Sequence, residues 1–167
     1  MRIRDEQEAD RPAVREIVSA EFDTGAEADL LDDLRAEAEP VVSLVAEEGG
    51  AVVGHVMFSP VSIAEHPDAK LMGLAPLAVR YEYQGRGIGS ALVRSGLERC
   101  REVGAIGVVA LGHPEYYPRF GFSPASRFGL KCEYDVPEGA FLALELEPGA
   151  LAGKPGTVRY HEAFGKL

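Results

Sequence analysis

Apolar side chains recur every three or four residues over three stretches of the chain. The first two stretches, residues 10–22 and 26–38, lie next to each other, and the third covers residues 88–103. This spacing places the apolar side chains on one face of a helix. We therefore predict three amphipathic helices, of which the second ends before Pro40 and the third before Gly104.

The other apolar residues gather in short runs with the length and composition of β-strands. The predicted strands are Val41–Glu47, Ala51–Pro60, Leu71–Val79, Ile106–Leu111, Arg127–Cys132, Phe141–Glu147 and Val158–Tyr160. A further short helix is expected over residues 113–120. This order of elements predicts one mixed α/β domain over residues 1–167, with one strand–helix–strand crossover.

Two residues would be unfavourable in these elements without a structural reason. Pro76 lies inside a predicted strand, although proline cannot donate a hydrogen bond to a neighbouring strand. Gly96 lies in the middle of the third helix, where it costs about 1 kcal/mol relative to alanine. We therefore expect a break in the strand near Pro76, and a close approach of the helix to the sheet at Gly96.

The composition fits a soluble protein. Hydrophobic residues make up 46% of the 167 residues, yet no apolar run approaches the ~20 residues of a membrane span. The first residues lack the apolar core of a secretory signal. Cys100 and Cys132 have no cysteine or histidine at metal-ligand spacing. We therefore predict a cytoplasmic protein without a membrane partner, a metal or a disulfide.

The charge is unevenly distributed. The net charge of −10 argues against nucleic acid as a partner. Residues 1–70 hold 17 acids and 6 bases, whereas residues 71–130 hold 4 acids and 7 bases. An anionic ligand is therefore expected near the middle of the chain, and a cationic one near its first section.

A glycine-rich loop separates the third predicted strand from the third predicted helix. It reads Gln84-Gly85-Arg86-Gly87-Ile88-Gly89, and Ser90 follows it. Glycines allow the backbone to approach a ligand, and the start of a helix presents unpaired N–H groups and a partial positive charge. This combination predicts a phosphate site.

The two commonest nucleotide loops fit this segment poorly. A Walker A loop needs a lysine after its last glycine, and this loop has none. A dinucleotide loop has G-x-G-x-x-G spacing and an acid at the end of the next strand, but the spacing here is G-x-G-x-G and residues 104–112 contain no acid. A nucleotide-binding protein of another α/β class stays open as an alternative.

The pattern Gln84-x-x-Gly87-x-Gly89 resembles the Q/R-x-x-G-x-G/A signature of GNAT (GCN5-related) N-acetyltransferases. Tyr117, Gly121 and Phe122 resemble the later Y-x-x-x-G-F element of the same family. The segment from Gly112 to Phe122 is similar to a bacterial subgroup of predicted N-acetyltransferases. The resemblance implies a mainly antiparallel central sheet flanked by helices, in which a splayed strand pair forms the acyl-CoA cleft.

The family resemblance assigns roles to particular residues. The loop amides hold the CoA pyrophosphate, and the strand before the loop bonds the pantetheine arm. The CoA-binding residues expected on this basis are Leu77, Ala78, Val79, Gln84, Gly85, Arg86, Gly87, Ile88, Gly89 and Ser90. Tyr117 stands where many members carry a tyrosine near the CoA sulfur, and it is the expected general acid.

The general base is left open. Many members of the family place a glutamate in the strand before the loop, but Leu71–Val79 contains no carboxylate. His113 and Glu115 follow the next strand and are the first candidates. His55 in the preceding strand is another, provided that it points into the cleft, and a water chain or the binding of a neutral amine are further alternatives.

The predicted function is the transfer of an acetyl group from acetyl-CoA, as co-substrate, to a primary amine in a ternary complex. Glu21 and Asp23 follow the first helix and are candidate acids of the acceptor site, which suits a cationic amine. The alternative is a non-catalytic, regulatory acyl-CoA-binding module, which the missing strand carboxylate favours. The resemblance also allows a homodimer.

Overall fold

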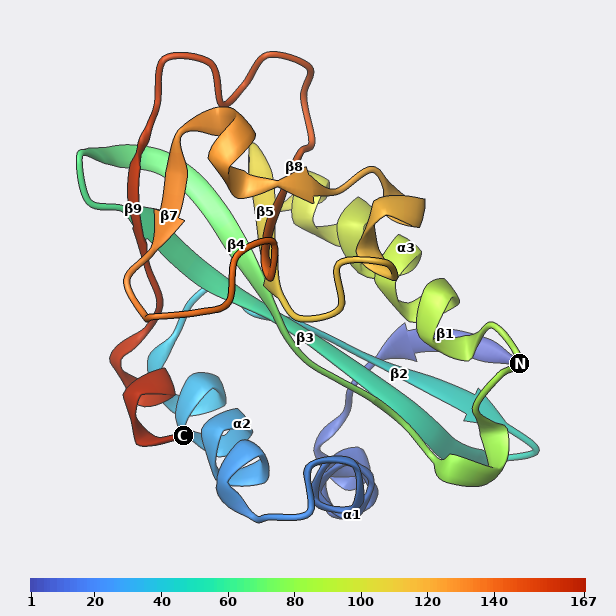
Figure 1. The fold of residues 1–167 in the computed structure, drawn as a ribbon. Helices are drawn as coiled ribbons and strands as arrows, with labels where there is room; N and C mark the ends of the chain where they lie inside the picture. The colour runs from blue at the N-terminus through green and yellow to red at the C-terminus, as the bar shows by residue number, and fades with distance from the viewer.

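The computed structural model describes residues 1–167 and contains three α-helices and nine strands (Figure 1). The α-helices are α1 (Arg11–Phe22), α2 (Ala26–Glu37) and α3 (Ile88–Glu102). The 3-10 helices are η1 (Glu8–Asp10), η2 (Tyr81–Tyr83), η3 (Tyr117–Phe120), η4 (Ala125–Phe128) and η5 (Glu162–Lys166). The strands are β1 (Arg2–Asp5), β2 (Val42–Glu48), β3 (Ala51–Ile63), β4 (His66–Val79), β5 (Gly107–Leu111), β6 (Ser123–Pro124), β7 (Leu130–Cys132), β8 (Phe141–Glu145) and β9 (Gly156–Arg159).

All nine strands belong to one sheet. Its main path runs in the order β1-β2-β3-β4-β5-β8-β6, and β9 pairs with both β3 and β7. The pairs β4–β5 and β7–β9 are parallel, and every other pair is antiparallel. The parallel pair β4–β5 is joined through α3, as the predicted crossover requires. The prediction of a mixed, mainly antiparallel sheet is confirmed.

The helices cover both faces of the sheet. Helices α1 and α2 pack on one face, and α3 crosses the other (Figure 1). Each face has its own buried cluster: Val14, Ile17 and Leu31 belong to one, and Leu92, Val93 and Phe58 to the other. The three predicted amphipathic helices thus bury their apolar stripes as expected.

Strands β4 and β5 separate where the sequence predicted a break. They pair in parallel only from Leu71 to Leu74, and the antiparallel register between β3 and β4 shifts around Pro76. The following residues, Leu77–Val79, pair with β3 but not with β5. A gap therefore opens between two neighbouring strands in the middle of the sheet.

The predicted contact at Gly96 is also present. A Cβ atom on this residue would lie 2.1 Å from Cε1 of Phe58 on β3. Because that distance is far below van der Waals contact, only glycine lets α3 lie this close to the ring. The position of α3 matters for function because the glycine-rich loop leads directly into its first turn.

Several boundaries differ from the sequence-based prediction. The predicted strand over Arg127–Cys132 is wrong in its first half, because residues 125–128 form a 3-10 helix that ends at Gly129 with φ near 72°. The helix predicted over residues 113–120 is limited to η3. β1 was missed because its Arg-Ile-Arg-Asp sequence is that of a charged edge strand. None of the helices combines the length and the apolar composition needed to cross a membrane.

Candidate functional site

A cleft of about 760 Å³ lies at the gap between β4 and β5. Its volume is typical of small-molecule sites. It is lined by the end of β4, the glycine-rich loop, the first turn of α3, the segment after β5, and parts of α1, α2 and η5. The lining residues used below are Glu21, Phe22, Glu27, Leu30, Leu77, Ala78, Val79, Gln84, Gly85, Gly87, Ile88, Gly89, Ser90, His113, Tyr116, Tyr117, Arg119 and Phe164.

The glycine-rich loop turns its backbone toward this cleft. Gly85 and Gly87 have φ angles of 77° and 81°, which side-chain-bearing residues rarely adopt. No heavy atom lies within 4 Å of the position of a Cβ at either glycine. Helix α3 begins at Ile88, so the amides of its first turn have no carbonyl partner within the helix. The loop and this turn therefore present a set of N–H donors suited to an anion.

The end of β4 forms the wall next to this loop. Leu77, Ala78 and Val79 all line the cleft, on the side of the strand from which β5 has separated. The side-chain amide of Gln84 donates to the carbonyl oxygen of Val79 over 3.0 Å. This bond fixes the loop to the strand end. Arg86 lies outside the lining, with its guanidinium 5.1 Å from the ring centroid of Tyr83.

Tyr117 lies in the cleft wall with 7% of its surface exposed. Its ring packs edge to face on Tyr116 and Phe122. Burial raises the pKa of Tyr117 to about 12. Its hydroxyl therefore stays protonated at physiological pH and is available to donate a proton.

Tyr116 was missed as a site residue in the sequence. Its ring lies over the start of α3, with its hydroxyl 3.3 Å from the Ser90 hydroxyl oxygen. Arg119, also missed, stacks on this ring at 4.4 Å from the centroid. Their spacing of three residues in a segment expected to be helical was the available signal, because such residues share a face.

The two first candidates for a general base are placed differently. His113 lines the cleft and its side chain is exposed to solvent. Glu115 is exposed and does not belong to the lining. Of the pair, only His113 lines the cleft.

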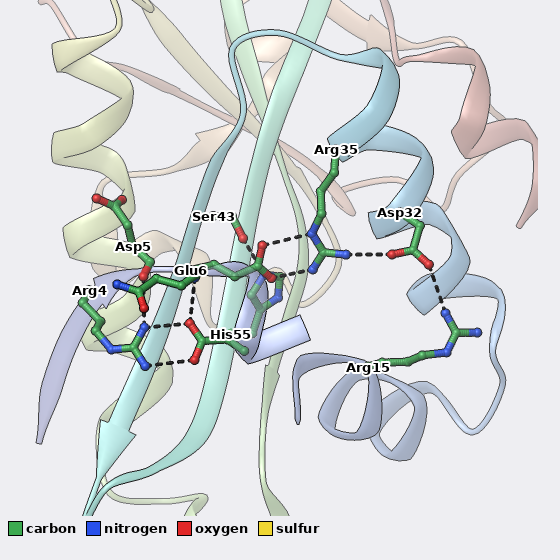
Figure 2. A network of polar contacts seen from close by, with 10 residues as sticks. Arg4, Asp5, Glu6, Arg15, Asp32, Arg35, Ser43 and His55 are labelled. Carbon is green, nitrogen blue, oxygen red and sulfur yellow. Dashed lines mark hydrogen bonds and ion pairs between the residues drawn. The ribbon is translucent and has the colours of Figure 1, made fainter. Parts of the chain in front are cut away.

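His55 was a candidate base only if its side chain pointed into the cleft. The structure shows that it does not. It is fully buried on the face of the sheet covered by α1 and α2, and its Nε2 lies 2.9 Å from the Ser43 hydroxyl (Figure 2). Burial is the largest cause that lowers the pKa of His55 to about 3, and the nearby Arg35 adds to the shift. The imidazole is therefore neutral and structural.

Glu6 connects His55 to a chain of ion pairs. Its carboxylate lies 3.8 Å from Nε2 of His55 and accepts a 3.0 Å hydrogen bond from Nε of Arg35 (Figure 2). Arg35 continues to Asp32, and Asp32 to Arg15. Because α2 carries Arg35 and α1 carries Arg15, this network holds the two helices against each other and against the sheet.

The acids after the first helix also differ in position. Glu21 lines the cleft, and Asp23 does not. Glu27 on α2 joins Glu21 in the lining, together with apolar Phe22 and Leu30. Sequence reasoning missed Glu27, although its place in the first turn of a predicted helix puts it close to the end of α1.

The acidic and basic groups of the cleft come from different elements. The two acids, Glu21 and Glu27, come from the helices on one face of the sheet. Arg119 and the N-terminal end of α3 lie on the side of the other buried cluster. The cleft can therefore receive an anionic group against α3 and a cationic group against α1 and α2.

The chain is similar to the proteins of one known family. The model of the acetyltransferase (GNAT) family matches residues 3–122. The chain is 40% identical over 168 residues to the uncharacterized N-acetyltransferase YhbS of Escherichia coli, and the match covers 100% of both chains.

Two solved structures are similar over nearly the whole chain. The crystal structure of Escherichia coli YhbS in complex with CoA matches with a TM-score of 0.92 at 40% identity, over 98% of this chain and 91% of that one. The crystal structure of a GNAT family acetyltransferase from Brucella melitensis in complex with acetyl-CoA matches with a TM-score of 0.80 at 37% identity, over 98% and 97%.

Proposed function

Because this chain belongs to the GNAT acetyltransferase family, we propose that it transfers the acetyl group of acetyl-CoA directly to an amine. Residues 1–167 act as one catalytic unit in this proposal. The observation that carries it is the continuity of the cleft. The cleft runs from the glycine-rich loop at Gly85 and Gly87, along the free edge of β4, to Tyr117.

The binding of acetyl-CoA follows from the shape and polarity of the cleft. The pyrophosphate lies against the loop from Gln84 to Gly89 and the first turn of α3, where N–H donors converge. The pantetheine arm runs along Leu77–Val79, whose backbone has no strand partner on the side of β5. The two relatives solved with CoA and with acetyl-CoA support the choice of this ligand.

The proposed acetyl transfer needs no covalent enzyme intermediate. The amine nitrogen attacks the thioester carbonyl carbon, and a C–N bond forms as the C–S bond breaks. The leaving thiolate takes a proton from the Tyr117 hydroxyl, whose high pKa keeps it protonated beforehand. The enzyme gains by holding amine and thioester together.

The amine must lose one proton in the same reaction. We assign its removal to His113, because this imidazole lines the cleft and imidazoles accept protons near neutral pH. Glu115 is the weaker candidate because it lies outside the lining. The proton that leaves the amine replaces, by way of solvent, the one that Tyr117 gave to the thiolate.

The acceptor in this proposal is a cationic amine. Glu21 and Glu27 supply negative charge on the wall formed by α1 and α2, and Phe22, Leu30 and Phe164 supply apolar surface beside them. A second cationic group on the acceptor would interact with the carboxylates while its reacting amine, in the neutral form, faces the thioester. Polyamines, aminoglycosides and lysine-bearing peptides have this chemistry.

A non-catalytic acyl-CoA-binding module is the second candidate. The absence of any carboxylate from Leu71–Val79 favours it, since no acid in this part of β4 can act as a base. Turnover separates the two. Incubation with acetyl-CoA and a panel of mono-, di- and polyamines should release CoA thiol with at least one acceptor. Tight binding of acetyl-CoA without thiol release across the panel would favour the binding module.

A further inference from the structure

Arg119 is the single lysine or arginine among the residues that line the cleft. Its Nε–H donates to the carbonyl oxygen of Tyr116 over 2.8 Å, and its guanidinium stacks on the Tyr116 ring. The side chain is exposed, yet these two contacts fix its direction. An arginine held in this way loses little further conformational freedom when it binds a ligand.

The outer end of this guanidinium is not engaged by the protein. The one hydrogen bond of Arg119 uses Nε, and no carboxylate lies within ion-pair distance of its two terminal nitrogens. Arg4, Arg15, Arg35, Arg80, Arg99 and Arg101, in contrast, all pair with acids. A planar pair of N–H donors facing a cleft is suited to two oxygens of one phosphate.

Tyr116 sets the distance of Arg119 from the start of α3. One edge of its ring reaches the Ser90 hydroxyl at 3.3 Å, and the Arg119 guanidinium lies over its face. Arg119 is therefore displaced by one aromatic ring from the first turn of α3. It is a neighbour of the predicted pyrophosphate site and not a part of it.

We propose that Arg119 binds the 3′-phosphate of CoA and so makes the protein discriminate CoA from dephospho-CoA. The inference rests on the proposed function, since it assumes that CoA occupies the cleft. The pyrophosphate is neutralised by the loop amides and the start of α3, whereas the 3′-phosphate is a separate group with a charge near −2 at pH 7. A fixed cation one ring away from the pyrophosphate site fits that second group.

Tyr116 is a positioning residue in this scheme. Its carbonyl and its ring hold the guanidinium, but it does not touch the 3′-phosphate itself. Its replacement by leucine should therefore weaken CoA binding and leave dephospho-CoA binding closer to that of the wild type. This pattern differs from a general loss of the cleft, which would weaken both.

The test is calorimetric titration of the full chain with CoA and with 3′-dephospho-CoA. Wild type should bind CoA about 10-fold more tightly than 3′-dephospho-CoA, because a hydrogen-bonded charge pair at a partly exposed site contributes on this scale. Arg119→Met should bind CoA about 10-fold more weakly and dephospho-CoA within about 2-fold of wild type. Arg119→Lys should keep part of the discrimination, since lysine retains the charge but not the planar pair of donors.

Arg94 provides a matched control. It is also an exposed arginine stacked on an aromatic ring, 5.1 Å from the centroid of Phe120, but it lies outside the cleft lining. Arg94→Met should keep the wild-type preference for CoA. An equal loss in Arg94→Met and Arg119→Met would mean that general surface charge attracts the ligand, and would overturn the proposal.

The remaining outcomes are equally decisive. A wild-type protein that binds CoA and dephospho-CoA equally overturns the role of Arg119 and leaves the proposed function standing. Equal weakening of both ligands by Arg119→Met places the residue at the pyrophosphate and also overturns the proposal. A wild-type protein that binds neither ligand overturns the proposed function together with this inference.

Discussion

The side-chain amide of Gln84 lies 3.3 Å from the carboxylate of Glu21, so the glycine-rich loop contacts the last turn of α1. This contact brings a residue of the proposed CoA loop to an acid of the proposed acceptor wall. Glu21→Gln removes the charge but keeps an oxygen that can accept the same hydrogen bond. We expect it to raise the KM for a cationic amine by about 2- to 5-fold, the range of an exposed ion pair.

The controls for this variant are Asp23→Asn and the KM for acetyl-CoA. Asp23 lies outside the cleft, so its variant should keep the wild-type KM for the amine. The KM for acetyl-CoA should change by less than about 2-fold in Glu21→Gln, and added salt should reduce the difference from wild type. If Glu21→Gln raised the KM for a neutral amine as much as that for a cationic one, the electrostatic role of Glu21 would be contradicted.

Tyr117→Phe tests the proton donor. The substitution removes one hydroxyl from a packed ring, so we expect kcat to fall by about 100-fold with little change in the KM for acetyl-CoA. Because the pKa of Tyr117 is raised to about 12, ionisation of this hydroxyl should not reduce wild-type kcat below about pH 10. Tyr134→Phe, a change outside the cleft lining, should behave as wild type. An unchanged kcat in Tyr117→Phe would remove Tyr117 from the mechanism.

His113→Ala tests the proposed base. We expect kcat to fall by about 100-fold, the lower end of the range for general-base catalysis, and imidazole added to the solution should restore part of the activity. Glu115→Gln should change kcat by less than about 2-fold, because Glu115 does not line the cleft. If kcat fell further in Glu115→Gln than in His113→Ala, Glu115 and not His113 would be the base.

His55→Gln tests the buried network by the pH dependence of stability. The folded pKa of His55 is lowered to about 3, below the value of about 6.5 in an unfolded chain. Between these values the unfolded state binds a proton that the folded state excludes, so the free energy of unfolding falls as the pH falls. From pH 7.5 to 5.0 this group contributes a loss of about 2 kcal/mol.

The measurement is urea unfolding of wild type and His55→Gln at pH 7.5 and 5.0. The loss of unfolding free energy between the two pH values should be about 2 kcal/mol smaller in the variant, since it lacks this imidazole. The carboxylates common to both proteins cancel in the comparison. An identical loss in both proteins would show that His55 does not stay neutral.

Gly96→Ala tests the contact between α3 and β3. The new methyl group would collide with the Phe58 ring, and we expect unfolding free energy to fall by about 2 kcal/mol despite the better helix propensity of alanine. Phe58→Leu should relieve the collision, so the double variant should be more stable than the sum of the single effects by about 1 kcal/mol or more. Glu98→Ala on the exposed side of α3 should change stability by no more than about 0.5 kcal/mol. Strict additivity of the two core changes would contradict the contact.

The sequence by itself determined the features that follow from periodicity and from unusual residues. The spacing of apolar residues located α1, α2 and α3, and Pro76 marked the place where β4 leaves β5. The loop from Gln84 to Gly89 was recognisable because phosphate binding at a helix start needs glycines in one short segment. All three signals are local, so they can be recognised without knowledge of the fold.

Only the tertiary structure decided which distant side chains share the cleft. His55 and His113 are both candidate bases in the sequence, yet strand register buries His55 beneath α1 and α2, and the loop after β5 exposes His113. In the same way Glu27 and Arg119 enter the site because separate elements meet at the gap between β4 and β5. A local pattern shows which residues share one face of a helix, but which other elements that face meets depends on how the elements pack.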